Sequence, residues 1–373
     1  MAKYKIKDLE KKYGGFTAPC YAIKINDKEI DQKYCHGDLK VELTADYESS
    51  SCVFQIANAF SPESNKKLKV KDDLKSLLKI GNKIELHIGY RTGGVTQVFS
   101  GYIDSIYVDY DKDDGILYTI EALDGKGIMM NSIRSETKTS IKKFSEAVEN
   151  IIKKYSAVIK IESSKLDKSD KELNMPIEQH NESDYHFVVR VAKKMDYCFF
   201  IEIGVLVFMP FSKLSKEPLF EFDINDYLLE FKVMTTLKNQ VSSVTVRGNN
   251  EKDPTKPFEA KVEKYNSLVD SGKVEAKAAR VISEYVTRTI TDPSVDSVEK
   301  ATQLAQAKLN ELSYQLYKGK VKVIGVPEAM PGKVVSVSGF GAELDKKYYV
   351  SKVTHKFKNN RFTTECELEV NKA

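Results

Sequence analysis

The sequence predicts a mainly β fold with α+β parts, in which two β-barrel domains flank a small α+β domain and a helical insertion interrupts the second barrel. Three observations predict this order. Apolar and polar residues alternate through much of the first 130 residues, two segments of helical period follow, and the last 53 residues alternate again. Because 373 residues exceed what one hydrophobic core supports, we expect two to four domains.

Residues 1–130 are expected to form the first barrel with an N-terminal extension. An Asn26-Asp27 turn between two short apolar segments predicts a hairpin over residues 21–30. Further strands are expected at 52–57, 84–90, 95–110 and 116–123, separated by turn residues at 92–94 and 113–115. The lysine-rich segment 61–79 is expected to be a surface excursion. A closed or nearly closed barrel would hide the edges of so many short strands.

Residues 131–215 are expected to form the α+β domain. Apolar residues at positions 141, 144, 148, 151 and 152 predict a helix with Thr139 or Ser140 as its N-cap, followed by a strand at 158–162. A second helix is expected to begin near Ser183, with Asp184 in its first turn, where a carboxylate suits the helix dipole. This helix is expected to pack on a hairpin formed by residues 197–203 and 205–211 about Gly204.

Residues 216–250 and 320–373 are expected to form the second barrel, and residues 251–319 the insertion. Strands are predicted at 219–224, 228–236, 241–249, 320–326, 333–339, 347–357 and 361–370. The polar segment 249–267, which contains Pro254 and Pro257, predicts a loop. The insertion ends in a helix with Asp296 and Glu299 as a capping-box-like pair, an apolar stripe from Val298 to Leu316, and Gly319 as its stop.

The charge balance argues against two classes of partner. The chain has 58 basic and 54 acidic residues, a net charge of +4, which is too even to indicate a nucleic acid or an anionic membrane. Only seven of the basic residues are arginine, the residue suited to bidentate phosphate and base contacts, so we expect no specific nucleic-acid binding. No run of 18 apolar residues occurs, so we expect no membrane anchor.

No motif for catalysis or ligand binding stands out. The five cysteines and five histidines are dispersed without metal-binding spacing, and no phosphate-binding loop, nucleophile elbow or zinc-protease motif occurs. The aspartates at 111, 113 and 114 lack the glycine and terminal glutamate of a calcium loop and are assigned to a turn. The sequence therefore predicts no catalytic residue, no cofactor, no metal site and no enzymatic activity.

Three segments carry a family resemblance. The residues that carry it are Gly89, Tyr90, Phe99, Gly101 and Ile103, then Glu182, Ser183, Asp184, Tyr185 and Phe187, then Pro331, Gly332, Tyr349, Val350 and His355. With these residues, segment 77–106 resembles the first barrel of bacteriophage late control gene D proteins, and segment 179–202 resembles the hub half of the type VI secretion spike proteins (VgrG). Segment 319–357 is similar to the closing barrel of the same superfamily.

The resemblance implies a structural baseplate hub of a contractile tail. Both barrels would be tail-tube-like, and a homotrimer would place six similar barrels in a ring that joins the six-fold tail tube to a three-fold spike. The implied partners are the tail tube or a tube-initiator protein, a separate spike or tip protein, and baseplate wedge proteins. The implied location is the tail of a phage virion, or of a phage-tail-like particle, assembled in the bacterial cytoplasm.

The matching residues also have structural interpretations. Gly89, Gly101, Gly325 and Gly332 are interpreted as turn or bulge residues. Phe99, Ile103 and Tyr349 are interpreted as barrel core, and His355 as a sheet residue rather than a ligand.

Two other functions remain open at this point. One is a peptidoglycan-degrading component of the same tail, which needs paired acidic residues in a cleft. The other is a carbohydrate-binding β module, which 20 tyrosines favour and the absence of tryptophan opposes. The choice between phage, bacteriocin and secretion system is also open.

Overall fold

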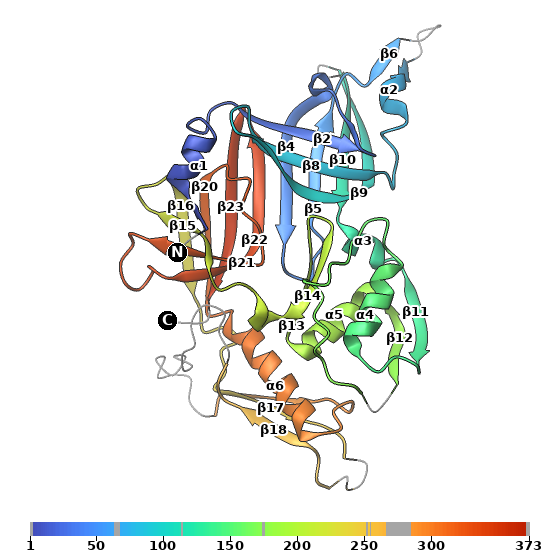
Figure 1. The fold of residues 1–373 in the computed structure, drawn as a ribbon, viewed down its shortest axis with the longest axis vertical. Helices are drawn as coiled ribbons and strands as arrows, with labels where there is room; N and C mark the ends of the chain where they lie inside the picture. The colour runs from blue at the N-terminus through green and yellow to red at the C-terminus, as the bar shows by residue number, and fades with distance from the viewer. Residues whose placement is uncertain are drawn as a thin grey trace.

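The computed structural model describes residues 3–62, 68–112, 115–173, 176–250, 253, 255–265 and 285–370. Strands dominate, and the largest sheet has 14 strands that fall into two sets (Figure 1). Two residues of the predicted turn at 113–115, and Pro254 of the predicted loop, lie outside the described residues. The mainly β class with α+β parts is confirmed.

The first set of strands follows the order β4-β5-β10-β9-β8-β2-β3. Its members are β2 (Pro19–Ile25), β3 (Lys28–Glu29), β4 (Cys35–Thr44), β5 (Ser51–Ile56), β8 (Lys83–Tyr90), β9 (Gly94–Asp111) and β10 (Gly115–Leu123). The predicted hairpin at 21–30 is confirmed, because Asn26 and Asp27 both have positive φ, the geometry that a two-residue hairpin turn requires.

The second set follows the order β16-β20-β23-β22-β21-β15. Its members are β15 (Pro218–Asp223), β16 (Leu228–Thr235), β20 (Tyr317–Ile324), β21 (Lys333–Ser338), β22 (Lys347–Lys358) and β23 (Arg361–Val370), and β1 (Tyr4–Lys5) adds to β15. Pairing of β22 with β4 joins the two sets edge to edge, and they share one apolar core. Among the described residues neither set closes into a barrel, so the two-barrel detail stays a prediction.

Smaller elements lie beside both sets. Helix α1 (Ile6–Lys12) lies near β15, and its Ile6 and Leu9 side chains are buried. The predicted surface excursion contains β6 (Phe60–Pro62), β7 (Leu68–Val70) and α2 (Asp72–Lys75), which lie at the outer end of the molecule in Figure 1.

The α+β part has a hydrophobic core of its own. It contains α3 (Gly125–Met129), β11 (Ile133–Lys138), α4 (Phe144–Lys153), β12 (Ile177–Ser183), α5 (Asp184–Met195), β13 (Tyr197–Glu202) and β14 (Val205–Pro210). The predicted start of α5 and the predicted hairpin are confirmed. Ser183 caps α5 by accepting a hydrogen bond from the His186 amide at 3.1 Å, and Ile203 and Gly204 have the positive φ of the hairpin turn.

Two predictions in this part were wrong. Helix α4 begins at Phe144, four residues after Ser140, because Asp170 accepts a hydrogen bond from the Ser145 amide at 3.1 Å and so replaces a local N-cap. The expected strand at 158–162 is an irregular segment that makes one bridge, between Lys160 and Val205.

A third apolar cluster lies under α6 (Val298–Ser313). Helix α6 packs on a sheet of β18 (Glu259–Val262), β17 (Ser243–Arg247) and β19 (Thr287–Thr291), in that order. The expected loop at 249–267 therefore contains a strand, and the expected strand at 241–249 belongs to this small sheet instead of the second set.

The predicted ends of α6 were also wrong. Ser297, which accepts a hydrogen bond from the Lys300 amide at 3.2 Å, is the N-cap, while Asp296 forms an ion pair with the Lys300 ammonium at 2.7 Å. The helix ends at Ser313, before Leu316. Gly319 lies within β20, where a Cβ atom would be 2.3 Å from the Lys232 carbonyl oxygen of β16, so the glycine permits close strand approach. None of the helices in the described ranges is long and apolar enough to span a membrane.

Candidate functional site

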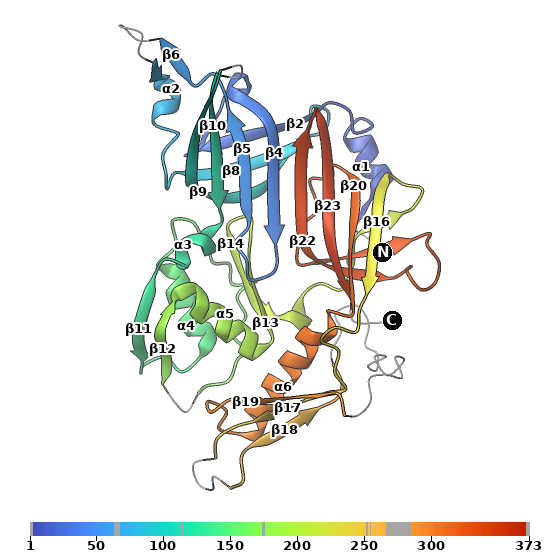
Figure 2. The same ribbon diagram turned by 180° about the vertical axis from the view of Figure 1, so that it is seen from behind.

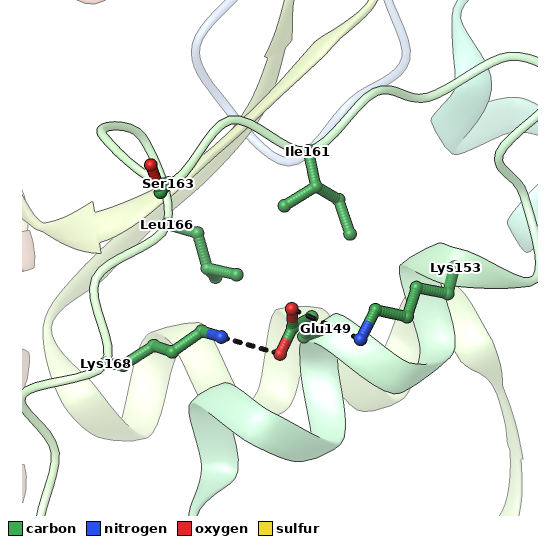
Figure 3. Close-up of a pocket in the computed structure, with 6 residues that line it drawn as sticks. All are labelled: Glu149, Lys153, Ile161, Ser163, Leu166 and Lys168. Carbon is green, nitrogen blue, oxygen red and sulfur yellow. Dashed lines mark hydrogen bonds and ion pairs between the residues drawn. The ribbon is translucent and has the colours of Figure 1, made fainter.

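A shallow hollow of about 590 Å³ lies beside α4. Figure 3 shows Glu149 between Lys153 and Lys168, with carboxylate–ammonium distances of 3.3 and 2.8 Å. The hydrogen bond from Lys168 lowers the pKa of Glu149, although burial opposes this effect. A carboxylate held ionised by two lysines is a poor general acid, and the hollow holds no second carboxylate.

No group of three or more histidine, cysteine or acidic side chains in the described part of the chain could hold a metal ion. His355 is fully buried in β22, and its Nδ1 atom lies 3.0 Å from the Thr364 hydroxyl of β23. Burial lowers the pKa of His355 to about 3, so the ring is neutral at physiological pH. This position within the sheet agrees with the structural interpretation of His355.

The motif residues of the first set lie in two neighbouring strands. Gly89 and Tyr90 end β8, while Phe99, Gly101 and Ile103 lie in β9. Phe99 and Ile103 are buried in the core. Gly89 and Gly101 serve strand packing instead of turns, because a Cβ atom would lie 2.2 Å from the Gly94 carbonyl oxygen and 2.1 Å from the Leu123 carbonyl oxygen, respectively.

The motif residues of the α+β part surround the start of α5. The Asp184 carboxylate is buried and accepts hydrogen bonds from Gln179 at 3.0 Å and Tyr155 at 2.7 Å, which lower its pKa against the opposing effect of burial. Glu182 forms an ion pair with Arg190 at 2.6 Å. Phe187 is buried in the α+β core. The Tyr185 hydroxyl donates to the Tyr47 carbonyl oxygen at 2.5 Å, which ties α5 to the loop after β4.

The motif residues of the second set lie around β21 and β22. Pro331 and Gly332 precede β21, and Gly332 has a φ of +76°, as a turn requires. Tyr349, Val350 and His355 are buried in β22. Gly325 instead packs against the Phe362 ring. The motif residues are therefore distributed over both strand sets and the α+β part, and they do not converge on one site. The sequence alone did not reveal this distribution.

The feature that sequence reasoning missed is a repeated strand order. The strands of the two sets correspond one to one. The first set has the order β4-β5-β10-β9-β8-β2, and the corresponding strands of the second set, in the same order, are β16-β20-β23-β22-β21-β15. Each set also has a bulge at the matching place: the register skips Asp104 in β9 and Ser351 in β22. In both sets a positive-φ glycine precedes the strand that pairs with the bulged strand, and its amide donates to the carbonyl oxygen of the residue just before the bulge. Gly81, before β8, donates to Ile103 at 2.8 Å, and Gly332, before β21, donates to Val350 at 2.9 Å.

The repeated order leaves two strand edges exposed. Within the chain, the second half of β22 pairs with β4. The matching half of β9, beyond Tyr102, and the outer edge of β16, which matches β4, have no strand partner in the described structure. Figure 2 shows the row β9, β10, β5, β4, β22, β23, β20, β16, with these two strands at opposite ends. These edges are the candidate assembly site.

Exposed apolar side chains lie on both edges. On β9, Tyr107, Val108 and Tyr110 are 53%, 56% and 75% exposed. On β16, Leu229 and Met234 are 59% and 57% exposed. Unpaired strand edges that carry large apolar side chains are suited to binding another chain.

Comparison with known proteins places the chain in a family. The family model described as the Alg8 N-terminal domain matches residues 18–359. The chain belongs to this family. Curated protein sequences include no match.

Solved structures with this fold include tail proteins. The 43 kDa tail protein of prophage MuSo2 from Shewanella oneidensis aligns with a TM-score of 0.68 at 14% identity, over 94% of this chain and 98% of that chain. The tail protein from Neisseria meningitidis MC58 aligns with a TM-score of 0.66 at 12% identity, over 95% and 97%.

A third structure is the Escherichia coli c3393 protein, described as a component of the type VI secretion system with structural similarity to T4 tail proteins gp27 and gp5. It aligns with a TM-score of 0.53 at 10% identity, over 94% of this chain and 77% of that chain. At these identities the comparisons establish a shared fold.

Proposed function

We propose that this chain is a structural hub subunit of a contractile phage tail or a phage-tail-like injection particle, such as a tailocin. The observation that carries the proposal is the repeated strand order, joined edge to edge inside the chain, with matching edges exposed at the two ends. Such a chain contributes two similar units to a ring, so a homotrimer presents six units to a six-fold tube and three to a spike. The fold shared with tail proteins supports this role.

The proposed partners follow from the position of a hub. The tail tube or a tube-initiator protein binds one face of the ring, a separate spike or tip protein binds the other, and baseplate wedge proteins surround it. The proposed location is the tail baseplate of the particle. The roles of the motif residues from Gly89 to His355 are proposed to be structural, since they lie in strands, caps and turns.

The alternatives have less support. A peptidoglycan hydrolase needs a carboxylate pair in a cleft, and the larger hollow offers Glu149 already bound by two lysines. A carbohydrate-binding module needs aromatic rings grouped along a groove. A second hollow of about 470 Å³ is lined by Lys153, Ser156, Ile159, Lys160 and Ile161, and in the described part of the chain no aromatic residue lines this hollow or the one beside α4.

An alanine scan of the ionisable residues tests the proposal against the hydrolase alternative. Each variant is scored for killing or infection and for the number of intact particles. A structural hub predicts that single substitutions leave activity within a few-fold unless particle number also falls. One substitution that abolishes activity with normal particle numbers, together with cleared peptidoglycan in a zymogram, would support the hydrolase.

A further inference from the structure

The internal contact between β22 and β4 provides a template at residue level. These strands are antiparallel, with Thr354 opposite Glu42 and Phe357 opposite Leu39. The amide of Ala45 donates to the Ser351 carbonyl oxygen at 2.8 Å. Hydrogen-bonded and non-hydrogen-bonded pairs alternate along an antiparallel ladder, so the Thr354–Glu42 pair is non-hydrogen-bonded.

The two bulges convert this template into a register for the exposed edges. Aligning Asp104 with Ser351 makes Tyr107 equivalent to Thr354. The residue pairing can be followed from β9 to β10, β5 and β4 in the first set, and from β22 to β23, β20 and β16 in the second set. Matching the paired residues along these two paths makes Met234 of β16 equivalent to Glu42 of β4. The equivalent contact therefore places Tyr107 opposite Met234.

We propose that β9 of one copy pairs antiparallel with β16 of a second copy, with Tyr107 opposite Met234, Asp109 opposite Lys232 and Tyr110 opposite Phe231. This inference rests on the proposed function only for the number of copies in the ring. A head-to-tail contact between unlike edges closes into a ring or continues as a filament, and the trimer corresponds to closure after three copies.

Side-chain chemistry fits this register on both faces of the sheet. On the face where the template buries His355 beside Val41 and Phe357 beside Leu39, the new contact places Val108 beside Val233 and Tyr110 beside Phe231.

On the opposite face, Tyr107 meets Met234, both more than half exposed in the single chain. Beside them, the Asp109 carboxylate meets the Lys232 ammonium, whose side chain is 70% exposed and already pairs with Glu230 of the same strand at 2.6 Å, so Asp109 would add a second carboxylate to this ammonium. A slip of one residue would place Val108 opposite Lys232 and Asp109 opposite Phe231. The apolar pairs and the charge pair therefore favour one register.

A disulfide trap tests the register in the full-length chain. The double variant Tyr107→Cys, Met234→Cys introduces a non-hydrogen-bonded pair, whose Cα atoms are about 4.5 Å apart in antiparallel sheets, within disulfide range. The control, Tyr107→Cys with Glu230→Cys, moves the second thiol four residues along β16, about 13 Å. Each single variant controls for the native cysteines.

Purified particles are oxidised and the chain is analysed on a non-reducing gel. We expect a covalent trimer from the test pair, more than ten times the yield of the control pair, and no trimer from the single variants. Equal yields from both pairs would overturn the register. Intact particles that contain three copies per ring but give no cross-link would overturn the strand pairing and leave the hub role standing.

Charge reversal gives a second readout. We expect Asp109→Lys and Lys232→Asp each to reduce particle number at least ten-fold, and the double variant to restore it. Both positions are exposed in the single chain, so the melting temperature of the isolated protein should stay within about 2 °C of the parent. If the double variant is no better than either single one, Asp109 and Lys232 are not opposite each other.

Discussion

Val188→Asp probes the packing of α5 on its hairpin. Val188 is fully buried in the α+β core, which also contains side chains of β13 and β14, so the variant removes apolar burial and buries a carboxyl group. Loss of the valine burial costs about 1.5–3 kcal/mol. A buried carboxyl group raises its own pKa from about 3.9 to 7 or above, and at pH 7 this costs about 4 kcal/mol.

The sum, about 6 kcal/mol, is comparable to the whole free energy of unfolding of a typical domain. Residues 131–215 should therefore unfold or become protease-sensitive. Circular dichroism melting and amide exchange across this segment measure the effect. Val188→Ala, which should cost about 2 kcal/mol, separates lost packing from charge burial. The Asp-minus-Ala difference should shrink as the pH falls from 7 to 4, because the new carboxyl group becomes protonated. An Asp variant that melts with the parent would refute the assigned facing of α5.

Three further outcomes are expected. The pKa of His355 is about 3 in the folded protein and about 6.5 in the unfolded chain. The free energy of unfolding should therefore fall by up to about 1.4 kcal/mol per pH unit as the pH falls from 6.5 to 3, and in denaturant titrations His355→Gln should reduce this dependence on pH. Burial raises the pKa of Asp196 to about 7, which gives the opposite sign, so Asp196→Asn should stabilise the protein more at pH 8 than at pH 4. Gly101→Ala, which forces a Cβ atom against the Leu123 carbonyl oxygen, should cost about 3 kcal/mol by chemical denaturation, whereas a cost under 0.5 kcal/mol would contradict this packing.

Local signals were sufficient for the elements that local chemistry controls. The Asn26-Asp27 turn, the Ser183 cap and the Ile203-Gly204 turn each depend on residues within a few positions, and the structure forms all three. The errors arose where a distant group takes part. Asp170 caps α4 from 25 residues away. Gly319 was predicted to end a helix. Instead, its lack of a side chain allows β20 to approach β16, which lies more than 80 residues earlier in the sequence.

The candidate assembly site was beyond sequence reasoning for a related physical reason. Tyr107, Tyr110 and Met234 look like ordinary strand residues, and alternation alone predicts that half of such residues are buried. Only the pairing of β22 with β4 shows that the matching edges of β9 and β16 have no strand partner among the described residues. The repeat itself is also hidden from the sequence, because the α+β part and the small sheet with α6 interrupt it.

The central claim is that this chain forms the ring between tube and spike. A cryo-electron microscopy reconstruction of the native particle that carries it tests this claim most directly. The account predicts three copies in one ring at the junction of tube and spike, with β9 of each copy beside β16 of the next. A ring of six or twelve copies, or a particle that lacks the chain, would contradict it.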